Sequence, residues 1–294
     1  MSRKWQIVWL ALLAVDLVIS PSRAEDSIYK DLSKPHAESA KLFMTFSEVM
    51  TNDVLARGAK LNGSEAVENH TIKTDNASYD IILARGGVIE KAGILMVNVT
   101  GDMPPRIANP IFNRFFSIDI YPKTPLVGMV HLAFTLGVDK QGRNSVYGWM
   151  DMMPAANVPE DVEYLRAKVD AYFAKVGRDP APHRQVVCTG EETADRTHRR
   201  KPSCAGVSLY PPPPREVTVE NTQFVAGAFE AVYNAYFDIL EKRKSQTFGP
   251  VELKAQAAMR RNWLEDQLFA DPFSSRLVPY AAWSLANAPP SVEY

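Results

Sequence analysis

The chain is poor in the residues that build metal and disulfide scaffolds, with two cysteines and five histidines among 294 residues. Two cysteines exclude a disulfide-rich scaffold and a four-cysteine zinc site. Lys and Arg number 33 against 34 Asp and Glu, and without a basic excess the charge gives no indication of nucleic-acid binding. Apolar residues make up 46% and charged residues 23%, which is typical of a globular protein with a sizeable core.

Motifs of several common enzyme classes are also missing. The sequence contains no Gly-x-Ser-x-Gly elbow, no Gly-x4-Gly-Lys-Ser/Thr phosphate loop and no Gly-x-Gly-x-x-Gly turn. Cys-x-x-Cys and His-Glu-x-x-His do not occur, and the histidines are scattered along the chain. We therefore expect no metal site built from neighbouring residues.

The first 24 residues have the pattern of a secretory signal peptide. Arg3 and Lys4 precede a short apolar run, and Ser22-Arg23-Ala24 fits a small-x-small cleavage site. The run is broken at Asp16 and is shorter than the roughly 20 residues of a spanning helix, although an uncleaved anchor is the alternative. We expect a signal peptide over 1–24, a mature domain over 25–294, and an exported protein, periplasmic or secreted, that is free of the membrane after cleavage.

Export to an oxidising compartment would allow the two cysteines to form a disulfide. Cys188 and Cys204 enclose a charged segment of 15 residues. A disulfide that closes a loop of this size contributes roughly 3 kcal/mol in the chain-entropy picture. The alternative is two buried free thiols.

The hydrophobic pattern predicts an α+β domain. Helical spacing of apolar residues occurs over 37–57, 160–176, 216–243 and 250–269. Strand-like runs occur over 79–84, 88–99, 115–121, 127–136, 145–150 and 206–210. The sequon-rich polar sequence that follows the first helix, up to about residue 78, shows no helix or strand pattern, and the segment 177–205 is predicted to be a charged loop. Because the strands between 79 and 150 follow one another without helices, the order favours an antiparallel sheet over a doubly wound fold.

A collinear set of motifs runs through the same region. Residues 90–93 read EKAG, 117–125 read SIDIYPKTP, 131–135 read HLAFT and 148–154 read GWMDMMP. These segments are similar to the EKAG, SSVxHPRNP, HxNxR and GGxDLTP segments of the oxygen-dependent coproporphyrinogen III oxidase family. Further similar segments follow at 198–206, 248–252 and 263–271, so the resemblance covers about residues 40–294.

The resemblance implies a single domain with a large antiparallel sheet flanked by helices on both faces, usually as a homodimer. It also implies an oxidoreductase of porphyrin and heme biosynthesis. The family's reaction converts two propionates of a tetrapyrrole to vinyl groups with O2 as co-substrate, and is described as needing no metal or organic cofactor. The expected partner is therefore a small tetrapyrrole-like substrate.

Two residues are the candidate catalytic groups under this resemblance. Asp151 matches the family's aspartate and could face the pyrrole N–H groups, or it could cap a turn at a strand end. His131 could act as a general acid or base near neutrality. Its alternative role is that of a hydrogen-bonded core histidine in an apolar strand.

Five residues are candidates for substrate binding. Ser117 could donate to a propionate, Lys123 keeps the charge of a family arginine, and Arg85 could bind a carboxylate at a glycine turn. Arg199 belongs to the basic cluster 196–201, and Asp271 matches a C-terminal aspartate of the family. For each, the alternative is an ordinary strand, turn or solvated surface residue.

Departures from the family segments leave the activity open. Thr135 and Ala133 replace an Arg and an Asn, and bulky Trp149 and Met150 replace small residues. Pro202, Ser203, Pro272 and Phe273 replace further Arg and Gly positions. Three hypotheses follow: an exported enzyme of this kind with a tetrapyrrole or another substrate, a non-catalytic binding protein for a tetrapyrrole or other planar ligand, and a structural or partner-binding protein with a filled pocket.

Overall fold

The structure is a computed structural model that describes residues 28–64, 66–104, 107–189, 204–210, 215–270 and 278–293. The predicted signal peptide lies outside these ranges, as do the candidate residues Arg199 and Asp271. Among the described helices, none combines the length and the apolar character that crossing a bilayer requires.

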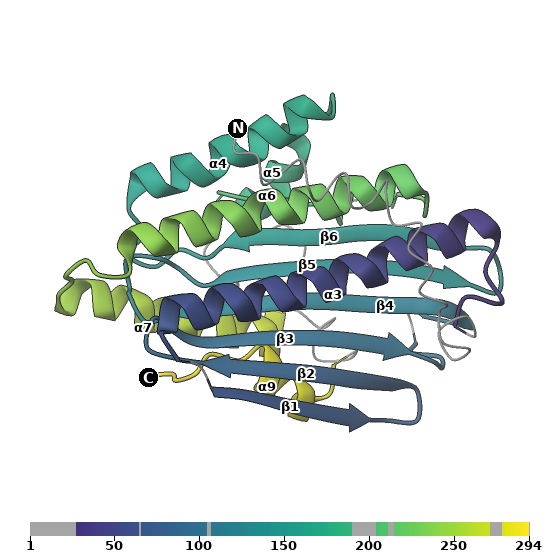
Figure 1. Cartoon of the computed structure of the whole chain (residues 1–294), viewed down its shortest axis with the longest axis horizontal. Coiled ribbons are helices and arrows are strands. Elements are labelled where there is room, and N and C mark those ends of the chain that lie inside the picture. Colours follow the sequence, from purple (N-terminus) through teal and green to yellow (C-terminus); the bar gives the residue numbers. More distant parts are fainter. Residues whose placement is uncertain are drawn as a thin grey trace.

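Seven antiparallel strands form one sheet whose spatial order is the order of the chain (Figure 1). This confirms the predicted α+β class with an antiparallel sheet. The strands are β1 Ala66–Lys73, β2 Ala77–Arg85, β3 Ile89–Val99, β4 Pro110–Pro122, β5 Val130–Asp139, β6 Asn144–Met152 and β7 Val207–Ser208.

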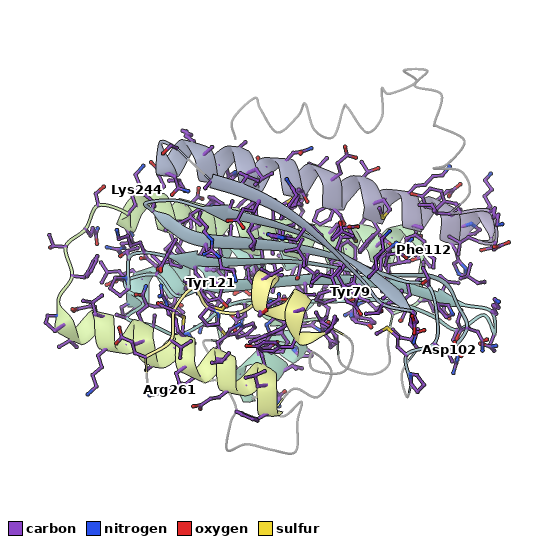
Figure 2. All side chains as sticks on the ribbon, turned by 90° about the horizontal axis from the view of Figure 1, so that it is seen from below. Tyr79, Asp102, Phe112, Tyr121, Lys244 and Arg261 are labelled. Carbon is purple, nitrogen blue, oxygen red and sulfur yellow. A yellow bond between two sulfur atoms is a disulfide. The ribbon has the colours of Figure 1, made fainter. Side chains whose placement is uncertain are left out.

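Helices cover both faces of the sheet. The first face carries α3 (Lys34–Asn62) and α6 (Val219–Arg243), and α4 (Pro159–Lys175) packs against α6. The second face carries α7 (Pro250–Glu265), the π-helical turn η1 (Asp266–Ala270) and α9 (Tyr280–Ala286), while α5 (Ala181–Thr189) lies beside β7. Figure 2 shows α3 and α9 on opposite sides of the strands.

Alternation along β4 assigns its side chains to the two faces. Phe116, Ile118 and Ile120 enter the large apolar core under α3 and α6. In that core Phe46 of α3 contacts Phe229 of α6, with ring centroids 5.3 Å apart. The intervening residues of β4 therefore point to the second face, and they include two buried polar residues.

Two elements differ from the predictions. The sequence predicts no strand over the residues of β1, but β1 is a strand at the edge of the sheet, and most of its residues are exposed. An edge strand without a buried side lacks the apolar alternation that identifies a strand in sequence. Helix α5 occupies part of the segment 177–205 that was predicted to be a loop. Its start is stabilised by Asp179, whose Oδ1 accepts from the backbone N–H of Ala181 at 2.9 Å.

The predicted disulfide is confirmed. Cys188, near the end of α5, is bonded to Cys204, which lies shortly before β7, with the two Cα atoms 4.6 Å apart. The alternative of two free thiols is therefore wrong. The bond fixes α5 beside the sheet edge, where Val187 packs against Trp149 on the second face.

Candidate active site

The strand register places residues from different motifs in one row across the second face. Gly93 is paired with Asp119, Asp119 with His131, and His131 with Asp151. The adjacent row runs through Leu95, Ser117, Ala133 and Trp149. Three predicted site residues, Ser117, His131 and Asp151, are thus brought together by β4, β5 and β6.

His131 and Asp119 form a close pair on the second face. The distance between His131 Nδ1 and Asp119 Oδ1 is 2.5 Å. Asp119 is fully buried, whereas the side chain of His131 remains 15% exposed. An ionised carboxylate can only accept a hydrogen bond, so this geometry makes His131 Nδ1 the donor to Asp119, and in the neutral form of the ring Nε2 would then be a bare acceptor. The indole of Trp263 lies beside the imidazole, with ring centroids 5.1 Å apart.

Asn287, directly after α9, contacts the other oxygen of Asp119. Its Nδ2 lies 2.9 Å from Asp119 Oδ2 and 3.4 Å from Ser117 Oγ. Its backbone carbonyl accepts from the Tyr121 hydroxyl and, at 3.1 Å, from the indole N–H of Trp263. The C-terminal segment therefore completes the surroundings of the His131–Asp119 pair.

Lys91 is a buried cation on the same face. Its Nζ donates to the carbonyl of Ala288 at 2.6 Å, and the residue is only 2% exposed. Burial lowers the pKa of Lys91 to about 8; the charge of Asp119 opposes this effect and that of Arg85 adds to it. Burial also raises the pKa of its cross-strand neighbour Tyr121 well above the ordinary value for a phenol.

Asp151 is buried, and one oxygen of its carboxylate accepts hydrogen bonds from two backbone N–H groups. Its Oδ1 accepts from the N–H of Met152 at 2.9 Å and from the N–H of Gly206 at 2.7 Å. A Cβ at Gly206 would lie 1.8 Å from the carbonyl oxygen of Met150, so only glycine permits this approach to β6. These contacts support the interpretation of Asp151 as a turn-holding residue, and its catalytic role stays a prediction.

The other predicted binding residues lie further out. Lys123 is exposed beyond the end of β4, four positions and so about 13 Å along the chain from Asp119. Arg85 is exposed at the end of β2, where its charge affects Lys91. The structure does not place Lys123 beside the pair.

Sequence reasoning missed four residues of this site: Lys91, Asp119, Tyr121 and Asn287. Asp119 was visible as a carboxylate in an apolar strand, at a position where the SSVxHP segment has Val, and Tyr121 stands where that segment has His. Lys91 was part of the EKAG match but was not singled out. Asn287 follows a helix outside every motif, so no local signal marked it.

The departures at Thr135 and Trp149 have a visible consequence. The hydroxyl of Thr135 is buried and has no hydrogen-bond partner within the described part of the chain. Trp149 is 6% exposed and packs with Ala133 and Val187. Ala133, at the Asn position of the HxNxR segment, therefore has apolar neighbours. Thr135, at the Arg position, is paired across the strands with Phe115 and Tyr147. Within the described ranges, no three His, Cys, Asp or Glu side chains converge as metal ligands.

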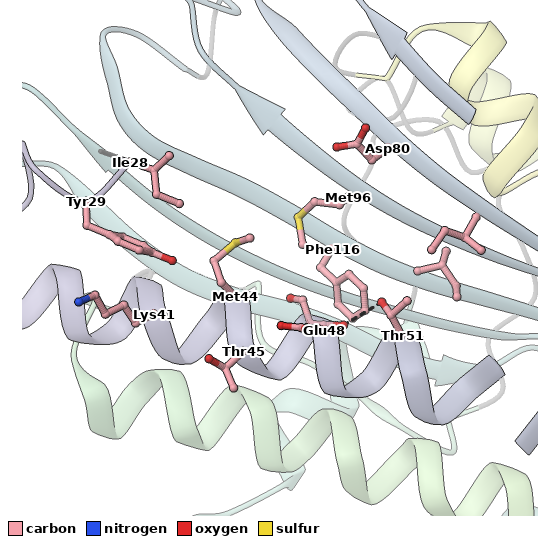
Figure 3. A pocket seen from close by; sticks show the side chains of 13 residues that line it. Ile28, Tyr29, Lys41, Met44, Thr45, Glu48, Thr51, Asp80, Met96 and Phe116 are labelled. Atoms are coloured by element: carbon pink, nitrogen blue, oxygen red, sulfur yellow. Dashed lines mark hydrogen bonds between the residues drawn. The ribbon is translucent and has the colours of Figure 1, made fainter. Parts of the chain in front are cut away.

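A cavity of about 540 Å³ lies on the first face, between α3 and strands β2 to β4. Met44 on α3 and Met96 on β3 line it, together with the carboxylates of Glu48 and Asp80 (Figure 3). The sheet separates this cavity from His131, so it is not part of the site on the second face.

The fold and the second face define an α+β protein with a buried carboxylate–imidazole pair at the centre of an antiparallel sheet. A family model described as coproporphyrinogen III oxidase matches residues 43–273, which include all seven strands. The chain belongs to this family, which confirms the resemblance seen in the motifs.

Proposed function

We propose that this protein is an exported oxidoreductase that oxidatively decarboxylates propionate side chains of a tetrapyrrole-like substrate, with O2 as electron acceptor and no metal or organic cofactor. Membership in the coproporphyrinogen III oxidase family supports the reaction class. The observation that carries the proposal is the His131–Asp119 pair, whose imidazole is held at Nδ1 and remains partly accessible.

The proposed reaction balances without a further reductant or oxidant. One propionate, one O2 and one proton give one vinyl group, one CO2 and one H2O2. The bond to the carboxylate carbon and one neighbouring C–H bond break, and the reduced substrate passes two electrons to O2. Nε2 of His131 accepts a proton released from the oxidised substrate, and Asp119 stabilises the imidazolium that forms.

A non-catalytic binding protein for a planar ligand is the second candidate, and the presence of Thr135 in place of the family arginine favours it. A charge-assisted hydrogen bond to a carboxylate contributes about 1.5–3 kcal/mol, and the arginine that would supply one is replaced here. Trp149 adds an aromatic surface next to Ala133. In this case the fold would hold a tetrapyrrole or similar ring without turning it over.

Direct incubation with substrate separates the two functions. The chain starting at Glu25 is mixed anaerobically with coproporphyrinogen III, and binding is followed by tryptophan fluorescence. O2 is then admitted, and the products are analysed by mass for loss of CO2 and two hydrogens per propionate. Catalytic product in the wild type and none in His131→Gln supports the enzyme. Binding without product supports the carrier, and no binding contradicts both.

Export and assembly form part of the same proposal. The N-terminal pattern supports a periplasmic or secreted location, and family membership supports a homodimer. Fractionation of cells that express the full chain tests the first, with N-terminal sequencing of the mature protein expected to begin at Glu25. Light scattering of the purified mature chain tests the second, since a monomer mass would contradict the dimer.

A further inference from the structure

The segment Ala286–Ala288, here called the C-terminal strap, crosses the second face beside the His131–Asp119 pair. A Cβ at Gly93 would lie 1.8 Å from the carbonyl oxygen of Ala286, so the strap reaches the sheet only over a glycine. Lys91 donates to the carbonyl of Ala288. The EKAG segment thus binds both ends of the C-terminal strap. Gly93 leaves space for the carbonyl of Ala286, and Lys91 donates a hydrogen bond to the carbonyl of Ala288.

The middle residue of the strap is held by its backbone. The N–H of Asn287 donates to the carbonyl of Trp283 at 2.8 Å, which ends α9. The carbonyl of Asn287 accepts from Tyr121 and Trp263. None of these contacts uses the side chain of Asn287, so its amide is not needed to hold the strap in place.

The amide instead serves Asp119. It donates to Oδ2 at 2.9 Å, and Asn287 is 5% exposed, so few water molecules can replace it. With Oδ2 occupied, Oδ1 is the oxygen that faces His131 Nδ1. A carboxylate held at both oxygens cannot rotate, and it therefore presents a fixed acceptor to the imidazole.

We propose that Asn287 is a positioning residue for proton transfer, which fixes Asp119 so that neutral His131 carries its proton on Nδ1 and keeps Nε2 bare toward the substrate. This inference rests on the proposed role of His131. It adds a third member to the pair, supplied by a part of the chain far from the sheet motifs. Asn287 acts through Asp119 and has no contact with the reacting atoms.

The experiment determines, in the absence of substrate, which ring nitrogen of His131 carries the proton. Protein with 15N-labelled histidine is examined by NMR at a pH where His131 is neutral, and its signals are assigned by comparison with His131→Gln. In the wild type we expect one protonated nitrogen at Nδ1 and one bare nitrogen at Nε2. Asn287→Leu keeps the size of the side chain and the backbone contacts but cannot donate, so we expect a mixture of both tautomers.

Asn287→Asp is the second variant, because it keeps the shape and reverses the polarity. Two facing carboxylates disfavour each other unless they share a proton. Within the pH range in which His131 stays neutral, we therefore expect the single Nδ1–H tautomer to return as the pH is lowered. Ser284→Ala on α9 is the control, and it should match the wild type. Thermal melting of each variant verifies that it is folded.

The outcomes separate this inference from the proposed function. A single Nδ1–H tautomer that persists in folded Asn287→Leu overturns the positioning role, as does an Nε2–H tautomer in the wild type. If Asn287→Leu does not fold, the pH dependence of Asn287→Asp decides, and a tautomer independent of pH overturns the inference. A wild type with the expected tautomer and no turnover contradicts the proposed function while leaving the positioning role intact.

Discussion

Lys91 gives a quantitative prediction about stability and pH. The lysine is 2% exposed, and burial lowers its pKa to about 8 from an ordinary value of 10.5. Lys91→Met keeps an unbranched apolar side chain and removes the titrating group. The hydrogen bond to Ala288 is lost at every pH. The difference in the free energy of unfolding between the two proteins therefore changes with pH only through protonation of Lys91.

The sign follows from proton binding in the two states. Between about pH 8 and 10.5 the folded chain has released the proton of Lys91 while the unfolded chain still binds it. Stability rises with pH wherever the unfolded state binds more protons. From pH 7 to pH 9.5, Lys91 thus adds about 2 kcal/mol to the free energy of unfolding of the wild type. At pH 7 Lys91 is charged in both the folded and the unfolded chain, so this gain in stability is absent.

Urea unfolding at pH 7, 8, 9 and 9.5 measures the effect. We expect the free energy of unfolding of the wild type relative to Lys91→Met to increase by about 2 kcal/mol across this range, because buried tyrosines titrate alike in both proteins. Lys123→Met, which removes an exposed lysine, corrects for the change in net charge. A difference that stays constant, or falls as the pH rises, would refute the assignment of Lys91 as a desolvated cation.

Three further perturbations test other parts of the structure. Asp151→Ala leaves the backbone N–H groups of Met152 and Gly206 without an acceptor, so it should lower the free energy of unfolding by about 1–3 kcal/mol, whereas Asp151→Asn should retain stability. Loss of turnover in the stable Asp151→Asn variant would support a catalytic role of Asp151, and full activity would exclude that role. Replacing Cys188 and Cys204 by Ser should cost about 3 kcal/mol, measured by urea unfolding, and an unchanged midpoint would contradict the value. Gly93→Ala should displace the C-terminal strap and lower the melting temperature, whereas Gly87→Ala, with open space around its Cβ, should not; equal melting temperatures would contradict the close approach.

The sequence predicted the parts of the fold in which a buried side creates a pattern. β2 to β6 were found because their apolar residues face α3 and α6 or the second face in strong runs. β1 was missed because it lies at an open edge and has no buried row. Helix α5 was missed because nine residues with a proline near the start carry little helical periodicity.

The site was predicted in part, for a physical reason. Motif positions identified His131, Ser117 and Asp151, and the register of an antiparallel sheet placed them side by side. Asp119 was not assigned a role, since its importance depends on which residue faces it across the strands. Asn287 reaches Asp119 from 168 positions further along the chain, a relation that no local pattern in a single sequence contains.

The order of the strands has a consequence for how the candidate site around His131 forms during folding. Strands β1 to β6 each pair with the strand that precedes them across a short connection, so this part of the sheet can grow hairpin by hairpin, which is the fast kind of assembly. Among the described strands, only β7 returns to the sheet after a long connection, which carries α4 and α5. The hydrogen bond between Asn287 and Asp119, in contrast, joins residues 168 positions apart, so it requires the closure of a long loop. Strands β1 to β6 can therefore be paired while His131 is still poorly oriented. If the proposed turnover is found, its recovery after dilution from denaturant should lag behind recovery of β-sheet circular dichroism.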